Sequence, residues 1–189
     1  MIEREVKVRV EDLDAVRSRL IEAGAELLEP KSRESNTLFD REGELRGHGC
    51  VLRVRRDGQG AKVTFKGPAV YEQQVKSRTE LETSVGDADR LEEILVALGL
   101  RATLRYEKDR EQWRFDGAVV ALDHTPLGDF VEVEAERPLE HLEGLGLADA
   151  EPERLSYVGL WLEARAANPA LGVDMVFPPS AREDPTERL

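Results

Sequence analysis

The sequence is short of cysteine and of long apolar runs, and both absences limit what the protein can be. Its single cysteine, Cys50, excludes an internal disulfide and a metal site made of clustered cysteines, and its place beside VLRVRR predicts a small buried residue. No run approaches the roughly 18 apolar residues of a membrane-spanning helix. The charged start of the chain, MIEREVK, also lacks the apolar core of a signal peptide. We therefore expect a cytoplasmic protein with no membrane partner.

Sequence motifs that hold phosphate or zinc are missing as well. No G-x-x-x-x-G-K-[ST] motif occurs, so side chains rather than a glycine-rich loop would have to hold a phosphate group. His48, His124 and His141 lie in polar segments without a second histidine at ligand spacing, which predicts surface residues rather than zinc ligands. The formal net charge of -12 argues against duplex nucleic acid as a partner.

What the sequence does contain is a series of strands with one charged face. The stretch IEREVKVRV, residues 2–10, places Ile2, Val6 and Val8 on one parity and mostly charged residues on the other, which is the pattern of a β-strand. Charge recurs in the same way in CVLRVRR, AKVTFKGP, KSRTELETSV, YEKDREQWRF and GDFVEVEAE. For a single strand, a sheet with one face in water explains this well. Because it recurs in strand after strand, we predict a barrel whose charged side faces a lumen.

Two helix patterns interrupt the strands, which indicates the class α+β. DLDAVRSRLIEAG and DADRLEEILVALG each begin with aspartate caps, carry an apolar stripe and stop at a glycine. A strand with Glu-x-Glu precedes each of them, with Glu3 and Glu5 before the first helix and Glu80 and Glu82 before the second. The constant spacing suggests a duplicated unit. With 189 residues, 40% of them hydrophobic, the chain can form one packed domain.

A lumen lined by carboxylates together with Lys and Arg side chains predicts a particular kind of ligand. Carboxylates supply the oxygen ligands that Mg²⁺ or Mn²⁺ take, and these ions bridge phosphate oxygens. Lysine and arginine neutralise the remaining phosphate charge. A metal-bound polyphosphate satisfies both sets of side chains.

A set of motifs in chain order resembles one known family. They are Glu3-x-Glu5-x-Lys7, LRVRR, TFKGP, RTELET, YEKDRE, ALDHTPLGDFVEVE and LSYVGLWLE, and they span residues 1–165. The family is the CYTH superfamily, also called triphosphate tunnel metalloenzymes, and the resemblance is closest to its class IV adenylyl cyclase-like branch, which is related to thiamine triphosphatases. It implies an eight-stranded antiparallel β-barrel with flanking helices, whose tunnel admits a triphosphate compound and Mg²⁺ or Mn²⁺.

The same resemblance implies roles for individual side chains. The metal-binding carboxylates would be Glu3, Glu5, Glu132 and Glu134, with Glu80, Glu82 and Asp123 as further candidates. The phosphate-binding set would be Lys7, Arg53, Arg55, Lys66, Arg78, Lys108 and Arg110. Lys66, which precedes Gly67-Pro68, is expected at the tunnel mouth beside the terminal phosphate. The alternative for each side chain is a salt bridge inside the lumen.

The resemblance leaves the reaction open. In hydrolysis, water attacks the terminal phosphorus; in cyclisation, the ribose 3'-hydroxyl of ATP attacks the α-phosphorus and pyrophosphate leaves. We favour hydrolysis, because cyclisation also needs a nucleoside pocket that the sequence does not reveal. A module that binds polyphosphate or a nucleotide without turnover is the third alternative, but a pure anion binder gains nothing from nearby carboxylates. The expected substrate is a small triphosphate: ATP, thiamine triphosphate or tripolyphosphate.

Two regions depart from the family or lie beyond it. Asn36, Thr37 and Leu38 stand where many members have a glutamine and an aromatic residue, so base specificity does not transfer. Residues 166–189 follow the expected tunnel domain and are rich in proline, which predicts a tail that is ordered through VDMVF and partly disordered beyond. Both a monomer and a homodimer remain open.

Overall fold

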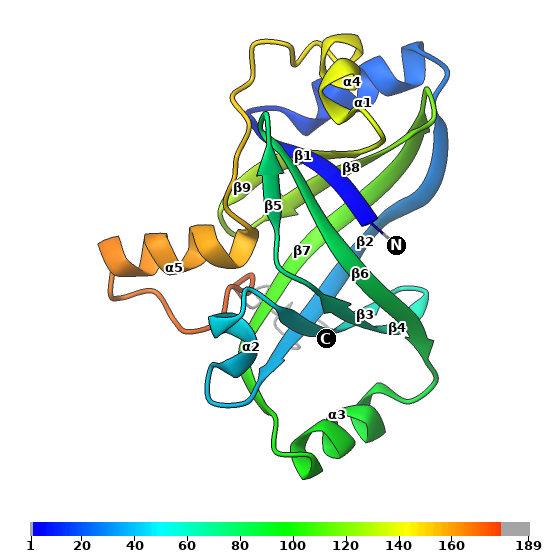
Figure 1. Ribbon diagram of the computed structural model, residues 1–189. Helices are drawn as coiled ribbons and strands as arrows, with labels where there is room; N and C mark the ends of the chain where they lie inside the picture. Colours follow the sequence, from blue (N-terminus) through cyan, green and yellow to red (C-terminus); the bar gives the residue numbers. More distant parts are fainter. Residues whose placement is uncertain (1, 179–189) are drawn as a thin grey trace, which may run out of the picture.

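The computed structural model of the protein describes residues 2–178, and within them the chain forms nine strands and five helices (Figure 1). The strands are β1 (Ile2–Val10), β2 (Glu26–Asp40), β3 (Val51–Asp57), β4 (Gly60–Lys66), β5 (Val70–Glu72), β6 (Val75–Val85), β7 (Arg101–Phe115), β8 (Ala118–Thr125) and β9 (Gly128–Glu134). The helices are α1 (Leu13–Glu22), α2 (Glu44–Gly47), α3 (Ala88–Ala97), α4 (Pro138–Gly144) and α5 (Tyr157–Ala167).

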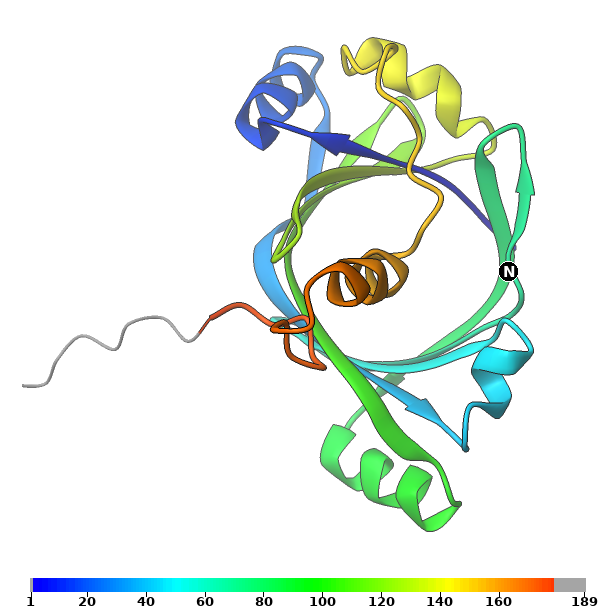
Figure 2. The same ribbon diagram turned by 90° about the vertical axis from the view of Figure 1, so that its left-hand side faces the viewer.

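The strands form an antiparallel sheet that closes on itself. Their order is β1-β9-β8-β7-β2-β3-β4-β6, and β1 also pairs with β6, while the short β5 adds to the other edge of β6. Figure 2 shows the strands closed into a ring. The predicted α+β class and the eight-stranded antiparallel barrel with flanking helices are therefore confirmed.

The two predicted helices are α1 and α3, and each begins at the aspartate expected to cap it. The Asp12 side chain accepts hydrogen bonds from the backbone N–H of Asp14 and Ala15, and Asp87 accepts one from Arg90. These bonds satisfy N–H groups that a helix start leaves without a partner. The same strand, cap and helix arrangement thus occurs twice, after β1 and after β6.

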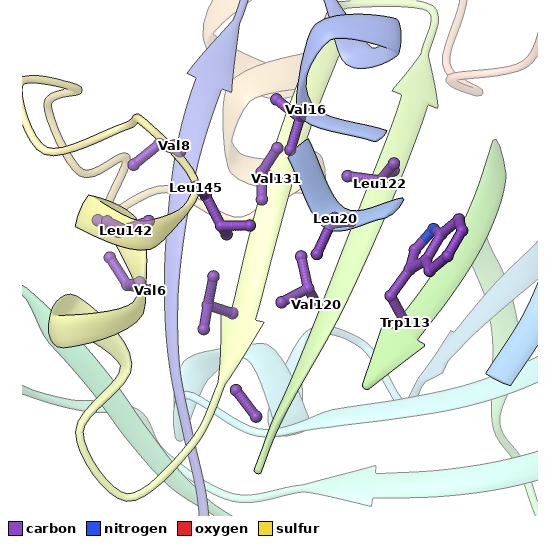
Figure 3. Packing of buried hydrophobic residues seen from close by; sticks show 12 residues of the cluster. Val6, Val8, Val16, Leu20, Trp113, Val120, Leu122, Val131, Leu142 and Leu145 are labelled. Atoms are coloured by element: carbon purple, nitrogen blue, oxygen red, sulfur yellow. The ribbon is translucent and has the colours of Figure 1, made fainter. Parts of the chain in front are cut away.

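Apolar side chains lie on the outside of the barrel wall, underneath the helices. The outer face of β1, β8 and β9 packs under α1 and α4, where Val8, Leu20 and Val131 are fully buried (Figure 3). α3 covers β3 through Leu95, which packs with Val54. Each fully buried aliphatic side chain contributes about 1.5–3 kcal/mol of transfer free energy. Because successive strand side chains alternate between faces, this outer packing turns the charged residues inward.

The C-terminal part of the described chain covers one opening of the barrel. Figure 2 shows α5 lying across the end of the ring of strands. The chain then returns to β7, where Met175 is fully buried and pairs with Tyr106, and the Trp161 side chain donates to the Val173 carbonyl at 3.0 Å. These contacts involve the first part of the predicted tail. The remainder, residues 179–189, lies outside the described residues.

Cys50 differs from its expectation, because it is only half-buried, in the turn between α2 and β3. It lines the barrel cavity rather than the hydrophobic core. His48 and His124 are exposed as predicted, whereas His141 is half-buried with its ring edge-on to Phe115.

Between residues 2 and 178, no helix is long and apolar enough to cross a membrane. The cytoplasmic location, the exclusion of duplex nucleic acid and the choice between monomer and homodimer stay predictions.

Candidate active site in the barrel lumen

The barrel encloses a cavity of about 1320 Å³ with charged walls. Nearly all of the predicted site residues line it, contributed by β1, β3, β4, β6, β7 and β9. They are Glu3, Glu5, Lys7, Arg53, Arg55, Lys66, Arg78, Glu80, Glu82, Lys108, Arg110, Glu132 and Glu134. The charged face of β1 thus faces the lumen rather than bulk water.

Three of the predicted metal ligands meet in this lumen. Glu3, Glu5 and Glu134 each offer a carboxylate oxygen, and these atoms lie within 4.8 Å of one another. Glu5 is the direct cross-strand partner of Glu134, and Glu3 precedes Glu5 by two residues on the same face of β1. The Oε2 atom of Glu3 is buried and accepts no hydrogen bond within the described part of the chain. Mg²⁺ or Mn²⁺ fits this set of hard oxygen donors, which we call the three-carboxylate cluster.

The three-carboxylate cluster favours protonation when no cation compensates its charge. Burial, with a further contribution from the hydrogen bond to Glu80, raises the pKa of Glu3 to about 9. Burial also raises the pKa of Glu134, and the nearby carboxylates of Glu132 and Glu5 add to this shift. A bound divalent cation would stabilise the ionised carboxylates instead. Metal binding at this cluster is therefore linked to proton release.

Other predicted metal ligands are engaged by cations or hydroxyl groups of the barrel. Glu80 accepts hydrogen bonds from Lys66 Nζ at 2.5 Å and from Arg78 Nε at 2.8 Å. Glu82 accepts one from Thr64 Oγ1 at 2.8 Å. Within the residues that the structure describes, neither belongs to the three-carboxylate cluster. Both are therefore held by side chains of β4 and β6, and Glu80 is also hydrogen-bonded to Glu3 of the three-carboxylate cluster.

Glu132 lies beside the three-carboxylate cluster but is bound to Arg110. Burial acts to raise its pKa, yet the charges of Arg110, Lys108 and Lys7 outweigh burial and hold the pKa well below its ordinary value. Glu132 therefore stays ionised and orients Arg110.

Asp123 differs from the other predicted ligands because it lies behind the cavity wall. Its fully buried carboxylate accepts hydrogen bonds from Lys108 Nζ at 3.1 Å, from Arg110 at 2.7 and 2.6 Å, and from the Tyr157 hydroxyl at 2.7 Å. These donors occupy most of its lone pairs. The geometry thus places Asp123 to orient Lys108 and Arg110 rather than to bind a metal.

Arg53 and Arg55 project side by side from β3 into the lumen. Arg55 Nη1 donates to Glu34 Oε1 at 2.9 Å, whereas Arg53 donates to the hydroxyl groups of Tyr106 and Thr64, both at 3.3 Å. The Nε atoms of both arginines are buried without a hydrogen-bond partner in the described residues. A buried donor without an acceptor costs about 1–3 kcal/mol, which phosphate oxygens would offset.

Lys7 lies between the lumen and the segment that leads into α5. Its Nζ donates to the Leu155 carbonyl at 2.5 Å and lies 4.4 Å from the centre of the Tyr157 ring. Burial lowers the pKa of Lys7 despite the nearby carboxylates of Glu132 and Glu5. This position connects the predicted phosphate site with the helix that covers the opening.

Several lumen residues were not among the predicted site residues. Lys62 and Lys76 have the parity of their predicted neighbours, so alternation alone could have identified them. Glu34 lies on β2, where register shifts between Leu27 and Glu29 and between Glu29 and Ser32 break the alternation. Tyr157 belongs to a helix, and no strand pattern points to it. Its place beside Asp123 follows only from the fold.

Known proteins resemble this chain in sequence and in fold. The family model described as CYTH domain matches residues 1–149. A Methanocaldococcus jannaschii protein named "Putative adenylate cyclase" is 27% identical over 173 residues, which are 85% of this chain and 98% of that protein. A solved Pyrococcus horikoshii protein has a TM-score of 0.71 and 28% identity, covering 86% of this chain and 99% of its own.

Two further solved structures share the fold at lower identity. A Vibrio parahaemolyticus "putative adenylate cyclase" has a TM-score of 0.74 and 21% identity, covering 83% of this chain and 95% of its own. A Hippeastrum "putative adenylyl cyclase", described as having a dominant triphosphatase activity, has a TM-score of 0.67 and 16% identity, covering 86% and 96%. The family match spans most of the sequence and agrees with the closed barrel. The chain belongs to the CYTH domain family.

Proposed function

We propose that the protein hydrolyses the terminal phosphate of a small triphosphate compound with the help of Mg²⁺ or Mn²⁺. One observation carries the proposal: the three-carboxylate cluster and the lumen cations line the same cavity. They are also contiguous, since Lys66 Nζ lies 3.7 Å from Glu3 Oε2. A triphosphate bound to a divalent cation matches such a junction of carboxylates and cations.

Glu3, Glu5 and Glu134 would hold the divalent cation, whose chemistry is to neutralise phosphate charge and to activate water. Arg53 and Arg55 would bind non-bridging phosphate oxygens through their Nε donors, which have no hydrogen-bond partner among the described residues.

In the reaction, water adds to the terminal phosphorus, the bond to the bridging oxygen breaks, and the diphosphate compound and phosphate leave. Lys108 and Arg110, oriented by Asp123, would stabilise the charge that develops on the phosphate oxygens.

The triphosphatase activity described for the Hippeastrum protein supports hydrolysis as the reaction to test first. Class IV adenylyl cyclase activity is the second candidate, favoured by the name of the Methanocaldococcus jannaschii relative. Both reactions need the same neutralisation of triphosphate charge, so the lumen cations fit either. They differ in the nucleophile and in which phosphorus is attacked.

The deciding experiment identifies the products. The purified protein is incubated with ATP, thiamine triphosphate and tripolyphosphate, each with Mg²⁺ or Mn²⁺. Phosphate and a diphosphate product support hydrolysis, whereas cyclic AMP and pyrophosphate from ATP support the cyclase. Glu5→Gln is the control for contaminating phosphatases, because it removes a cluster carboxylate. Metal-dependent binding without any product would overturn both activities and leave a binding module.

A further inference from the structure

The chain that follows α5 returns to the barrel and pairs with an edge of β7 that β8 leaves uncovered. β8 pairs with β7 only from Asp109 onward, so among the described strands none continues along the first half of that edge. Met175 occupies it: its N–H donates to the Arg105 carbonyl, and its carbonyl accepts the N–H of Glu107, both at 2.9 Å. Figure 2 shows this part of the chain turning back from α5 to the strands. We call residues 171–177 the C-terminal strap.

Side chains hold the C-terminal strap to β7 and to α5. The Asp174 carboxylate accepts the backbone N–H of Arg105 at 2.8 Å. From α5, the Trp161 ring donates to the Val173 carbonyl at 3.0 Å. The strap therefore connects the helix that covers the barrel opening with the wall of the barrel.

The far end of the C-terminal strap is anchored by Phe177. Its ring centre lies 4.0 Å from the Arg33 guanidinium, and the ring stacks on His124 with 5.3 Å between centroids. Its N–H donates to the Glu107 carboxylate at 3.2 Å. Aromatic stacking and cation–π contacts of this kind are favourable. The strap is thus held along its length and not only at α5.

Met175 is the residue through which the strap enters the core. It is fully buried and belongs to the same hydrophobic cluster as Tyr106, Tyr157 and Trp161. Tyr157 and Trp161 are four residues apart on α5, so their side chains lie on the same face of the helix. A flexible methionine side chain fills the irregular space between rings well. The strap therefore supplies part of the packing around two tyrosines.

Both tyrosines reach the predicted phosphate-binding side chains. The Tyr106 hydroxyl accepts a hydrogen bond from Arg53 at 3.3 Å. The Tyr157 hydroxyl donates to Asp123 at 2.7 Å, and Asp123 in turn orients two lumen cations. Hydrogen bonds weaken steeply when distance or angle departs from the preferred geometry. A small shift of either ring would therefore change how these cations are held.

We propose that the C-terminal strap is a positioning element for the lumen: it fixes the two tyrosine rings whose hydroxyl groups hold the phosphate-binding side chains. This rests on the proposed function, since the positioning is defined by the binding of a triphosphate in the lumen. The strap follows residue 149, where the match to the CYTH family model ends. The positioning element thus lies outside the part of the chain that the family model describes.

The test separates positioning from a purely structural role. Met175→Ala removes the buried side chain, and Met175→Leu replaces it with one of similar volume. Val176→Ala is the matched control, because Val176 is the next strap residue and is 41% exposed. Trp161→Phe keeps an aromatic ring but removes the bond to Val173, so it replaces Met175→Ala if that variant does not fold. Dissociation constants for tripolyphosphate are measured by calorimetry in EDTA, at a temperature at which circular dichroism shows each variant to be folded.

We expect Met175→Ala to weaken tripolyphosphate binding about three- to tenfold and Trp161→Phe about two- to fivefold. Met175→Leu and Val176→Ala should stay within about twofold of the wild type. When Met175→Ala is combined with Tyr157→Phe, the loss should be smaller than the product of the two single losses, because both changes act on one hydroxyl group.

Two results would overturn the inference while the proposed function stands. One is a folded Met175→Ala or Trp161→Phe variant that binds tripolyphosphate like the wild type, which would leave the strap a structural role alone. The other is a double variant in which the single losses multiply. A wild type that does not bind tripolyphosphate would instead overturn the proposed function, and the inference with it.

Discussion

Replacing Glu34 by glutamine should destabilise the fold and at the same time tighten the binding of tripolyphosphate. Glu34 is 3% exposed, and its Oε1 accepts a hydrogen bond from Arg55 Nη1 at 2.9 Å. Its Oε2 lies 3.6 Å from Lys108 Nζ. The carboxylate therefore stabilises two cations of the lumen, and it would compete with phosphate for both.

The effect on stability follows from the pKa of Glu34. Burial acts to raise this pKa, but the charges of Lys108, Arg110 and Arg55 outweigh burial and lower it from 4.5 to about 2. At about 1.4 kcal/mol per pH unit, the difference corresponds to about 3 kcal/mol of unfolding free energy at neutral pH. Because the pKa is lower in the folded state, this contribution is present above pH 4.5 and is lost as the pH falls towards 2. Urea unfolding should show a difference between wild type and Glu34→Gln that narrows in that range.

The effect on binding has the opposite sign. In the wild type, Arg55 must give up its charge-assisted hydrogen bond to Glu34 before it can bind a phosphate oxygen, and such a bond has a net value of about 1.5–3 kcal/mol. In Glu34→Gln, Arg55 no longer has this charge-assisted bond to give up. We expect the dissociation constant of tripolyphosphate to fall about tenfold, measured by calorimetry in EDTA at pH 7.5. Glu26→Gln on the same strand is the matched control, since the exposed Glu26 lies 3.7 Å from the exposed Arg114. Such a surface pair contributes about 0–1 kcal/mol. Weaker tripolyphosphate binding by Glu34→Gln would refute the idea that Glu34 competes with the ligand.

Three further substitutions test the site. Glu3→Gln should weaken Mn²⁺ binding. In the absence of metal, the unfolding free energy of the wild type should fall as the pH rises from 4.5 to about 9, because the raised pKa of Glu3 in the folded state stabilises its protonated form, and Glu3→Gln should remove this fall. An unchanged pH profile in the variant would contradict this. Arg53→Ala should weaken tripolyphosphate binding about ten- to a hundredfold and monophosphate binding much less, and equal losses would argue for a solvated side chain. Tyr157→Phe removes the hydroxyl that donates to Asp123 at 2.7 Å, so the KM for the substrate should rise severalfold, whereas Tyr71→Phe, whose hydroxyl lies outside the lumen, should leave KM unchanged.

Side-chain alternation was enough to predict which face of most strands points inward. Glu3, Glu5 and Lys7 line the cavity, and so do Arg53 and Arg55, as their parity requires. The signal is strong because a barrel with an apolar outer face allows one orientation for each strand.

The alternation of side chains along a strand could not distinguish carboxylates that lie beside one another from carboxylates that pair with a Lys or Arg side chain. That difference depends on strand register, which brings Glu134 opposite Glu5 but sets Glu80 opposite Lys66. The same limit applies to Glu34, because irregular pairing in β2 hides its parity. Register arises from the closed barrel as a whole and is not encoded within one strand.

The pairing pattern of the lumen couples the proposed metal site to the proposed phosphate site. In the structure, Lys76 Nζ donates to Glu5 Oε1 at 2.6 Å, so one carboxylate of the three-carboxylate cluster is held by a lumen cation. A divalent cation bound to Glu5 would take over this carboxylate and release Lys76 for phosphate oxygens. A phosphate that engages Lys76 would in turn leave Glu5 free for the metal. Because such coupling is reciprocal, each ligand would raise the affinity for the other by the same factor. An acidic protein of net charge -12 should thus bind a triphosphate more tightly together with its metal than without it.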